Sequence, residues 1–229
     1  MAVAEPSGSR IWEIDLVRGI CIVMMVAFHL VVDLREFYHQ PLEYQSGFWF
    51  YLGRVTVAVF MFIAGVSSVL NRRIIRHGLT VLAAGCLITA ATRIFTPDLY
   101  VRFGILQFMG VAILSVPVMG KLSSIWLVVA ALLVLLAGQA IQGLTGHWLL
   151  LPLGIMYEGY RSFDYYPLIP WYSVFLLGMV AGRLFYAEKK GKISPITGLN
   201  WLARIGRHSL SIYLVHQPVL LALLYFFFI

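Results

Sequence analysis

Four ionisable side chains in the first apolar stretch have types and spacings that could do chemistry. His29 and Asp33 are one helical turn apart, so a ring nitrogen and a carboxylate could lie on the same helix face. A carboxylate that accepts a proton from an imidazole fixes its tautomer, which is what a general base needs. Asp15 and Arg18 form a second pair, also on one face, near the start of the stretch. The sequence therefore predicts polar sites at both ends of one helix.

The helix that must position these residues covers residues 13–33. Twenty-one residues at about 1.5 Å each are enough to cross a hydrocarbon core of about 30 Å. If the span starts near Ile14, His29 lies roughly 22 Å along it, in the outer half. An ionisable group in hydrocarbon costs a few kcal/mol, so such groups usually face a bundle interior or a wet cavity and mark function. Interhelical packing by His29 is the structural alternative.

Composition indicates an integral membrane protein. The 229-residue chain is 61% hydrophobic and 12% charged, with a mean hydropathy of +0.87, which is more apolar surface than a soluble core can hide. The formal charge of +7 does not indicate nucleic-acid binding, because basic residues in membrane proteins gather in cytoplasmic loops. No cysteine or histidine spacing is typical of a metal site. We expect no bound metal and no nucleic acid.

The hydropathy pattern predicts an all-α bundle of about seven transmembrane helices, forming one domain over residues 1–229. The spans cover about 14–34, 51–70, 78–95, 104–119, 122–142, 168–186 and 209–228. The first span is expected to be an uncleaved anchor. Seven spans put the termini on opposite sides of the membrane, so a cytoplasmic N-terminus puts the C-terminus outside. The positive-inside rule supports this orientation, since twelve basic residues then lie inside: Arg10, Arg18, Arg72, Arg73, Arg76, Lys121, Arg183, Lys189, Lys190, Lys192, Arg204 and Arg207. Five lie outside: Arg35, Arg54, Arg93, Arg102 and Arg161.

The connecting segments carry further expectations. Residues 148–156 are apolar but too short to cross, so a re-entrant or interfacial segment is expected there. The aromatic and charged residues that follow, up to residue 166, could hold a sugar or form an aromatic belt at the lipid headgroups. Residues 196–208 read as an interfacial helix. Gly178 and Gly182 would allow another helix to approach closely.

Three strings resemble the transmembrane acyltransferase superfamily. Residues 14–19 read Ile-Asp-Leu-Val-Arg-Gly and are followed, after nine apolar or small residues, by His29. Residues 209–218 match a closing Ser-x-x-x-Tyr-Leu-x-His-x-Pro segment, and residues 60–67, Phe-Met-Phe-Ile-Ala-Gly-Val-Ser, are similar to the second helix of that group. Together they look most like the small prokaryotic relatives of the heparan-alpha-glucosaminide N-acetyltransferase catalytic domain.

This resemblance implies a reaction and a place. An acetyl group would pass from cytoplasmic acetyl-CoA to an amine or hydroxyl, commonly of a sugar or amino sugar, on the far side of a bacterial or archaeal cytoplasmic (inner) membrane. The inner-side candidates for the coenzyme phosphates are Arg18, Arg204 and Arg207, with the start of the last helix near His208.

Two polar residues inside the spans have possible roles in the transfer. His216 could touch the acyl chain, or it could pack and orient its neighbours. Gln107 could stabilise a thioester oxyanion, or it could form an interhelical hydrogen bond.

The chain departs from the family pattern at its proposed base. Eukaryotic members, as the resemblance reads, carry Asn at the position of His29 and place the catalytic His in the external stretch after the first helix, where this chain has His39. Either histidine could be the base, and either direct transfer or an acyl-histidine would use it. Larger members have more helices, so a homodimer is one way to complete the tunnel.

Two functions of other classes stay open. Polar residues at both ends of one helix would also suit a small-molecule transporter or flippase in the lipid bilayer. A noncatalytic subunit of a cell-envelope complex would need none of this chemistry. The absence of an internal repeat argues modestly against a transporter.

Overall fold

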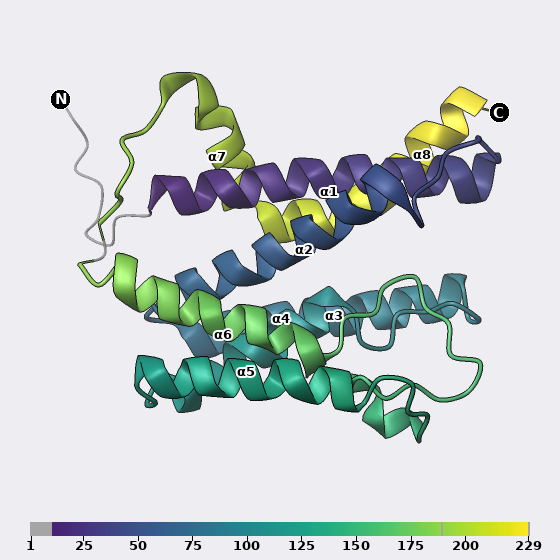
Figure 1. The fold of residues 1–229 in the computed structure, drawn as a ribbon. Coiled ribbons are helices and arrows are strands. Elements are labelled where there is room, and N and C mark those ends of the chain that lie inside the picture. The colour runs from purple at the N-terminus through teal and green to yellow at the C-terminus, as the bar shows by residue number, and fades with distance from the viewer. Residues whose placement is uncertain (1–10, 189, 229) are drawn as a thin grey trace. The chain divides into compact units, whose positions relative to one another are not determined.

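The computed structural model describes residues 11–188 and 190–228, so Arg10 and Lys189 of the inner-side set lie outside it. Within these residues the chain is helical and contains no β-strand, which confirms the predicted all-α class. Its α-helices, shown in Figure 1, are α1 (Trp12–Tyr38), α2 (Gly47–Ser68), α3 (Ile74–Phe95), α4 (Ile105–Met119), α5 (Ser124–Ala140), α6 (Leu168–Phe185), α7 (Asn200–Arg207) and α8 (Ser209–Phe228). Two short 3-10 turns, Trp148–Leu153 and Thr197–Leu199, lie in the connections.

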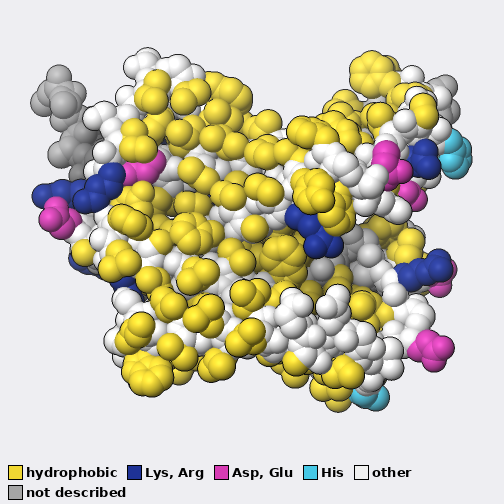
Figure 2. Space-filling model, viewed as in Figure 1, with side chains coloured by type: hydrophobic (Ala, Val, Ile, Leu, Met, Phe, Trp, Pro, Cys, Tyr) yellow, Lys and Arg dark blue, Asp and Glu magenta, His cyan; other side chains and the backbone are white. Residues whose placement is uncertain are grey.

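The protein is a multi-pass membrane protein. Five helices, α1, α2, α3, α6 and α8, are long and apolar enough to cross a bilayer. The other two predicted spans are helical too, but α4 has 15 residues and α5 has 17. Figure 2 shows hydrophobic side chains over much of the visible helix surface, as expected for helices that face lipid. Seven crossings, and which side each end faces, stay predictions.

The chain forms two compact units. The first unit contains residues up to Phe60 and from Glu188 onward, and the second contains Met61–Ala187. The boundary falls inside α2, and the first unit joins the two ends of the chain. The single domain expected over residues 1–229 stays a prediction.

In the first unit, α7 and α8 pack along α1 (Figure 1). Gly19 of α1 and Gly206 of α7 allow the closest approach, because a Cβ on Gly19 would collide with the Leu202 carbonyl and one on Gly206 with the Asp15 carbonyl. The Trp12 indole also donates to the Asn200 side chain at 2.9 Å. The helix predicted within residues 196–208 is thus confirmed, and it packs against the start of α1.

The second unit pairs α3 with α4 and α5 with α6. The close approach predicted for Gly178 and Gly182 is confirmed, since Cβ atoms there would meet the carbonyl oxygens of Phe62 and Val66 on α2. The segment expected to be re-entrant or interfacial forms a 3-10 turn that ends at Gly154, whose φ of 100° suits glycine. This turn and the chain after it pack near the start of α4, where Asp164 accepts the Ile105 N–H at 2.9 Å.

The α1–α7 crossing leads to a stability prediction. Gly19→Ala should lower the free energy of unfolding by about 1–3 kcal/mol, because its Cβ would overlap backbone that cannot move aside cheaply. Gly198→Ala is the matched control, since a Cβ there meets no atom within 4 Å, and it should change stability by less than about 0.5 kcal/mol. Thermal unfolding in detergent measures both. Equal melting temperatures for the two variants would contradict the packing described here.

Candidate functional site

Two imidazole rings are stacked in the first unit, one from α1 and one from α8. The ring centroids of His29 and His216 are 4.9 Å apart and the ring planes differ by 14°. His216 Nδ1 lies 2.6 Å from the carbonyl oxygen of Tyr213. Because a carbonyl only accepts, Nδ1 carries the proton and Nε2 of a neutral His216 is left as a proton acceptor.

Both rings keep a nitrogen without a hydrogen bond. His216 Nε2 and His29 Nδ1 are buried and have no hydrogen-bond partner. A buried polar atom left unsatisfied costs about 1–3 kcal/mol, so such atoms are rare in native proteins and need an explanation. An explanation that suits an imidazole is a proton-transfer role toward a bound substrate.

Asp33 lies on the same helix, one turn beyond His29, and is 2% exposed. Its Oδ1 accepts a hydrogen bond from Gln217 Nε2 at 2.7 Å, and its Oδ2 is buried without a partner. The hydrogen bond expected between His29 and Asp33 is not formed among the described residues. The Gln217 amide occupies the carboxylate instead, while the His29 ring faces His216.

A second polar group joins α1 to α7 near the start of α1. Asp15 is 5% exposed, with its Oδ2 3.2 Å from Arg207 Nε and its Oδ1 3.8 Å from Arg18 Nη1. The predicted pairing of Asp15 with Arg18 is therefore confirmed, and Arg207 completes it. Asp15 precedes His29 by 14 residues, or about 21 Å along the helix axis.

The remaining first-unit candidates are exposed. Arg204 is exposed on α7, and His208 follows it as the residue that ends this helix and precedes α8. His39 ends α1 with a positive φ of 52° and is exposed. It lies ten residues, or about 15 Å of helix, beyond His29. The structure therefore brings His29, Asp33 and His216 together but leaves His39 apart from them.

Gln107 belongs to the second unit, where its amide holds α3 to α4. Nε2 donates to the Gly85 carbonyl and to Thr89 Oγ1, both at 2.7 Å, and Oε1 accepts the Gly104 N–H at 3.0 Å. These contacts match the interhelical hydrogen bond that the sequence left open as the alternative to an oxyanion role. Both N–H groups are engaged within the protein.

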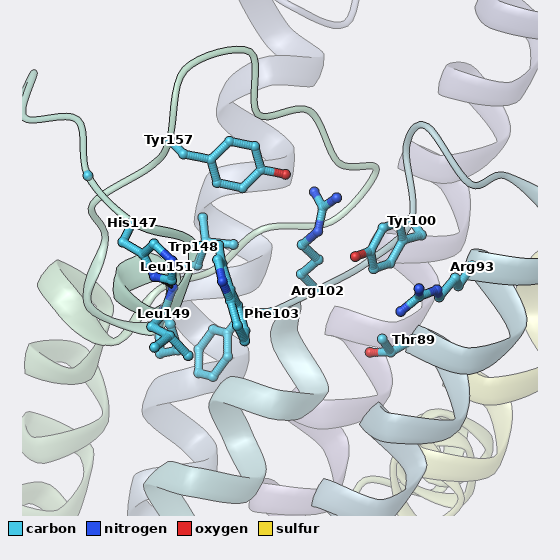
Figure 3. A pocket seen from close by; sticks show the side chains of 12 residues that line it. Thr89, Arg93, Tyr100, Arg102, Phe103, His147, Trp148, Leu149, Leu151 and Tyr157 are labelled. Carbon is cyan, nitrogen blue, oxygen red and sulfur yellow. Dashed lines mark hydrogen bonds between the residues drawn. The ribbon is translucent and has the colours of Figure 1, made fainter.

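The second unit also contains a pocket of about 780 Å³ where α3 and α4 meet the 3-10 turn and the loop after it. Figure 3 shows the Arg102 side chain rising between the rings of Tyr100 and Tyr157. The Arg102 guanidinium carbon lies 4.0 Å from the first ring centroid and 5.3 Å from the second. Among the described residues no group of three or more His, Cys, Asp or Glu side chains could hold a metal ion.

The sequence does not reveal three of these partners: His216 for His29, Gln217 for Asp33 and Arg207 for Asp15. Gln217 was not proposed for Asp33, although an amide between a histidine and a proline in an apolar span is a visible signal. Arg207 was expected at the coenzyme phosphates and not at Asp15. In all three pairs the partners are more than 180 residues apart along the chain, and spacing cannot match them.

The contact between Asp33 and Gln217 leads to a prediction. Gln217→Leu should destabilise the protein by about 1–3 kcal/mol, because it leaves a buried carboxylate without its donor. Replacing both residues, Asp33→Leu with Gln217→Leu, should recover much of this loss, since no buried polar group then lacks a partner. Thermal unfolding of the single and double variants gives the coupling energy. Additive losses would show that the two side chains do not interact.

Comparison with known proteins gives a match to a protein family. The family model described as "Heparan-alpha-glucosaminide N-acetyltransferase, catalytic" matches residues 10–218, which include α1, the first half of α8 and both polar groups of the first unit. No curated protein and no solved structure matches the chain. Because the match covers most of its length, the chain belongs to the heparan-alpha-glucosaminide N-acetyltransferase catalytic-domain family, a membrane acetyltransferase family.

Proposed function

We propose that the protein transfers an acetyl group from cytoplasmic acetyl-CoA to an amine or hydroxyl of a sugar on the opposite side of a prokaryotic cytoplasmic membrane. The observation that carries the proposal is the stacked pair His29 and His216, each with a buried ring nitrogen free of hydrogen bonds. Family membership supplies the reaction class. The identity of the donor, the identity of the acceptor and the direction of transfer across the membrane are part of this proposal.

The basic residues near the start of α1 suit the phosphates of the coenzyme. Arg207 and Arg18 both form ion pairs with one carboxylate, that of Asp15. The three side chains together therefore have a net charge of +1. Arg204 is exposed nearby on α7, and α8 begins directly after His208. Guanidinium groups bind phosphate through paired hydrogen bonds, and a helix start favours an anion. The pantetheine arm would then run along α1 toward His29.

The histidine pair suits the transfer step. A neutral His29 would take the proton from the acceptor amine or hydroxyl as that group attacks the thioester carbonyl carbon. The new C–N or C–O bond forms, the C–S bond breaks, and the CoA thiolate leaves and is protonated. His216 would hold the His29 ring in place by stacking, and Nε2 of His216 is a second proton acceptor. An acyl-histidine intermediate would place the acetyl group on the same ring.

His29→Gln should lower acetyl transfer from radiolabelled acetyl-CoA to an amino sugar by about 10²- to 10⁴-fold, because the proton acceptor is lost. Coenzyme binding should persist, since the proposed phosphate contacts are at the other end of the helix. His39→Gln tests the alternative base, and His77→Gln, an exposed histidine outside the site, is the control. A large loss in His39→Gln alone would assign the base to the external loop.

The same preparation separates the other two functions. A transporter or flippase would move its substrate into proteoliposomes without coenzyme and would tolerate His29→Gln. A noncatalytic subunit would neither bind acetyl-CoA nor transfer acetate to any acceptor. Either pattern, in protein that unfolds at the wild-type temperature, would overturn the proposed reaction.

A further inference from the structure

The pocket of the second unit has no role in the transfer step proposed above, and its lining has a definite chemistry. Seven of its side chains carry aromatic rings or guanidinium groups: Arg93, Tyr100, Arg102, Phe103, His147, Trp148 and Tyr157 (Figure 3). Its volume of about 780 Å³ is within the range of about 300–1,000 Å³ that is usual for small-molecule sites. The pocket is thus large enough for a monosaccharide or a disaccharide.

The charge of this pocket is positive. The Arg102 guanidinium lies over the rings of Tyr100, Tyr157 and Tyr160. The Arg93 guanidinium carbon lies 5.7 Å from the Tyr100 ring centroid. Among the described residues neither guanidinium forms an ion pair. A guanidinium keeps its charge at any physiological pH, so both positive charges persist.

The neighbouring phenols do not neutralise these charges. Burial raises the pKa of Tyr160, and burial next to Tyr160 raises the pKa of Tyr165 to about 12, so both hydroxyls stay protonated at neutral pH. The Tyr160 hydroxyl is itself buried without a hydrogen-bond partner. The negative charge of Asp164 also raises the pKa of Tyr160. This carboxylate accepts a hydrogen bond from the Ile105 N–H at the start of α4.

Topology does not account for the two arginines. In the orientation that the positive-inside rule favours, only five Lys and Arg residues lie on the outer side, and Arg93 and Arg102 both line this pocket. Basic residues placed for topology would be on the other side. Aromatic rings and cations at the headgroup level are common, but they need not enclose a pocket.

We infer that this pocket binds a polyol, such as a sugar ring or a glycerol headgroup, that carries an oxyanion, a phosphate or a carboxylate. Arg102 and Arg93 would hold the oxyanion by paired hydrogen bonds, and Tyr100, Tyr157 and Trp148 would pack against the polyol. The inference goes beyond the proposed acetyl transfer and does not depend on it. The oxyanion could belong to a soluble phosphorylated sugar or to a glycerophospholipid headgroup, and the experiment separates these sources.

The test is calorimetric titration of the full-length protein in phosphatidylcholine nanodiscs, without acetyl-CoA. Glucose 6-phosphate is the anionic probe and glucose the neutral one. Glucose 6-phosphate should bind saturably, and its affinity should fall as the salt concentration rises. Glucose should bind at least tenfold more weakly. Arg102→Gln should lower the affinity for glucose 6-phosphate by about 10- to 100-fold, because it removes charge-assisted hydrogen bonds to the oxyanion.

Matched variants control for folding and for net charge. Arg161→Gln removes one exposed positive charge from the same loop region without touching the pocket lining, and it should leave binding within twofold. Arg102→Lys keeps the charge but loses the paired geometry, so its affinity should fall between wild type and Arg102→Gln. All variants must unfold at the wild-type temperature. If Arg102→Gln unfolds at a lower temperature, Arg93→Gln replaces it in the comparison, since Arg93 also lines the pocket.

The lipid arm repeats the titration in nanodiscs that contain phosphatidylglycerol. If phosphatidylglycerol lowers the affinity for glucose 6-phosphate in wild type but not in Arg102→Gln, the oxyanion site stands and its source is a headgroup. If phosphatidylglycerol leaves the affinity of the wild-type protein unchanged, the oxyanion comes from a soluble phosphorylated sugar. The inference is overturned if glucose binds as well as glucose 6-phosphate, if Arg102→Gln and Arg161→Gln behave alike, or if the probe binds in neither bilayer.

Discussion

A buried carboxylate needs a partner, and α1 carries three buried carboxylates: Glu13, Asp15 and Asp33. Asp15 and Asp33, which are 5% and 2% exposed, are the two that bind side chains of α7 and α8. Both find their long-range partners near the end of the chain: Arg207 for Asp15 and Gln217 for Asp33. These two interactions fix how α7 and α8 lie along α1, because a shift of either helix would leave a charge unpaired in a low-dielectric region. Glycines at the α1–α7 crossing then allow the backbones to touch.

The histidine pair follows from that constraint. With Gln217 bound to Asp33, the preceding residue, His216, is presented to His29 and the two rings stack. The Tyr213 carbonyl fixes the His216 tautomer, so its unpartnered nitrogen can accept a proton. Such nitrogens reduce stability, and proteins retain unsatisfied polar atoms mainly where function requires them. In a member of an acetyltransferase family, proton transfer during acyl transfer is a function that fits.

Much of the fold could be predicted from the sequence, because apolar periodicity and length identify a membrane helix locally. The same holds for the pairing of Asp15 with Arg18, which are one turn apart, and for the small-residue contact at Gly178. The partners of Asp33 and His29 could not be predicted, since residues 184 positions apart meet only through helix packing. The arginine-lined pocket was only partly predictable. The sequence indicated that the aromatic and charged residues after residue 156 could hold a sugar, and Tyr157 of that cluster lines the pocket, but nothing in the sequence placed Arg93, Arg102 or Trp148 beside it. The pocket wall combines helix ends with an irregular loop, where no periodicity indicates which side chains converge.

A structure of the protein with CoA bound tests the central claim most directly, because it locates the reacting sulfur relative to the two rings. The account predicts the coenzyme phosphates beside Arg18, Arg204 and Arg207 and the thiol within reach of a ring nitrogen of His29. Density for the coenzyme at another place, with the imidazoles enclosed by packed side chains and closed to both sides of the membrane, would contradict it.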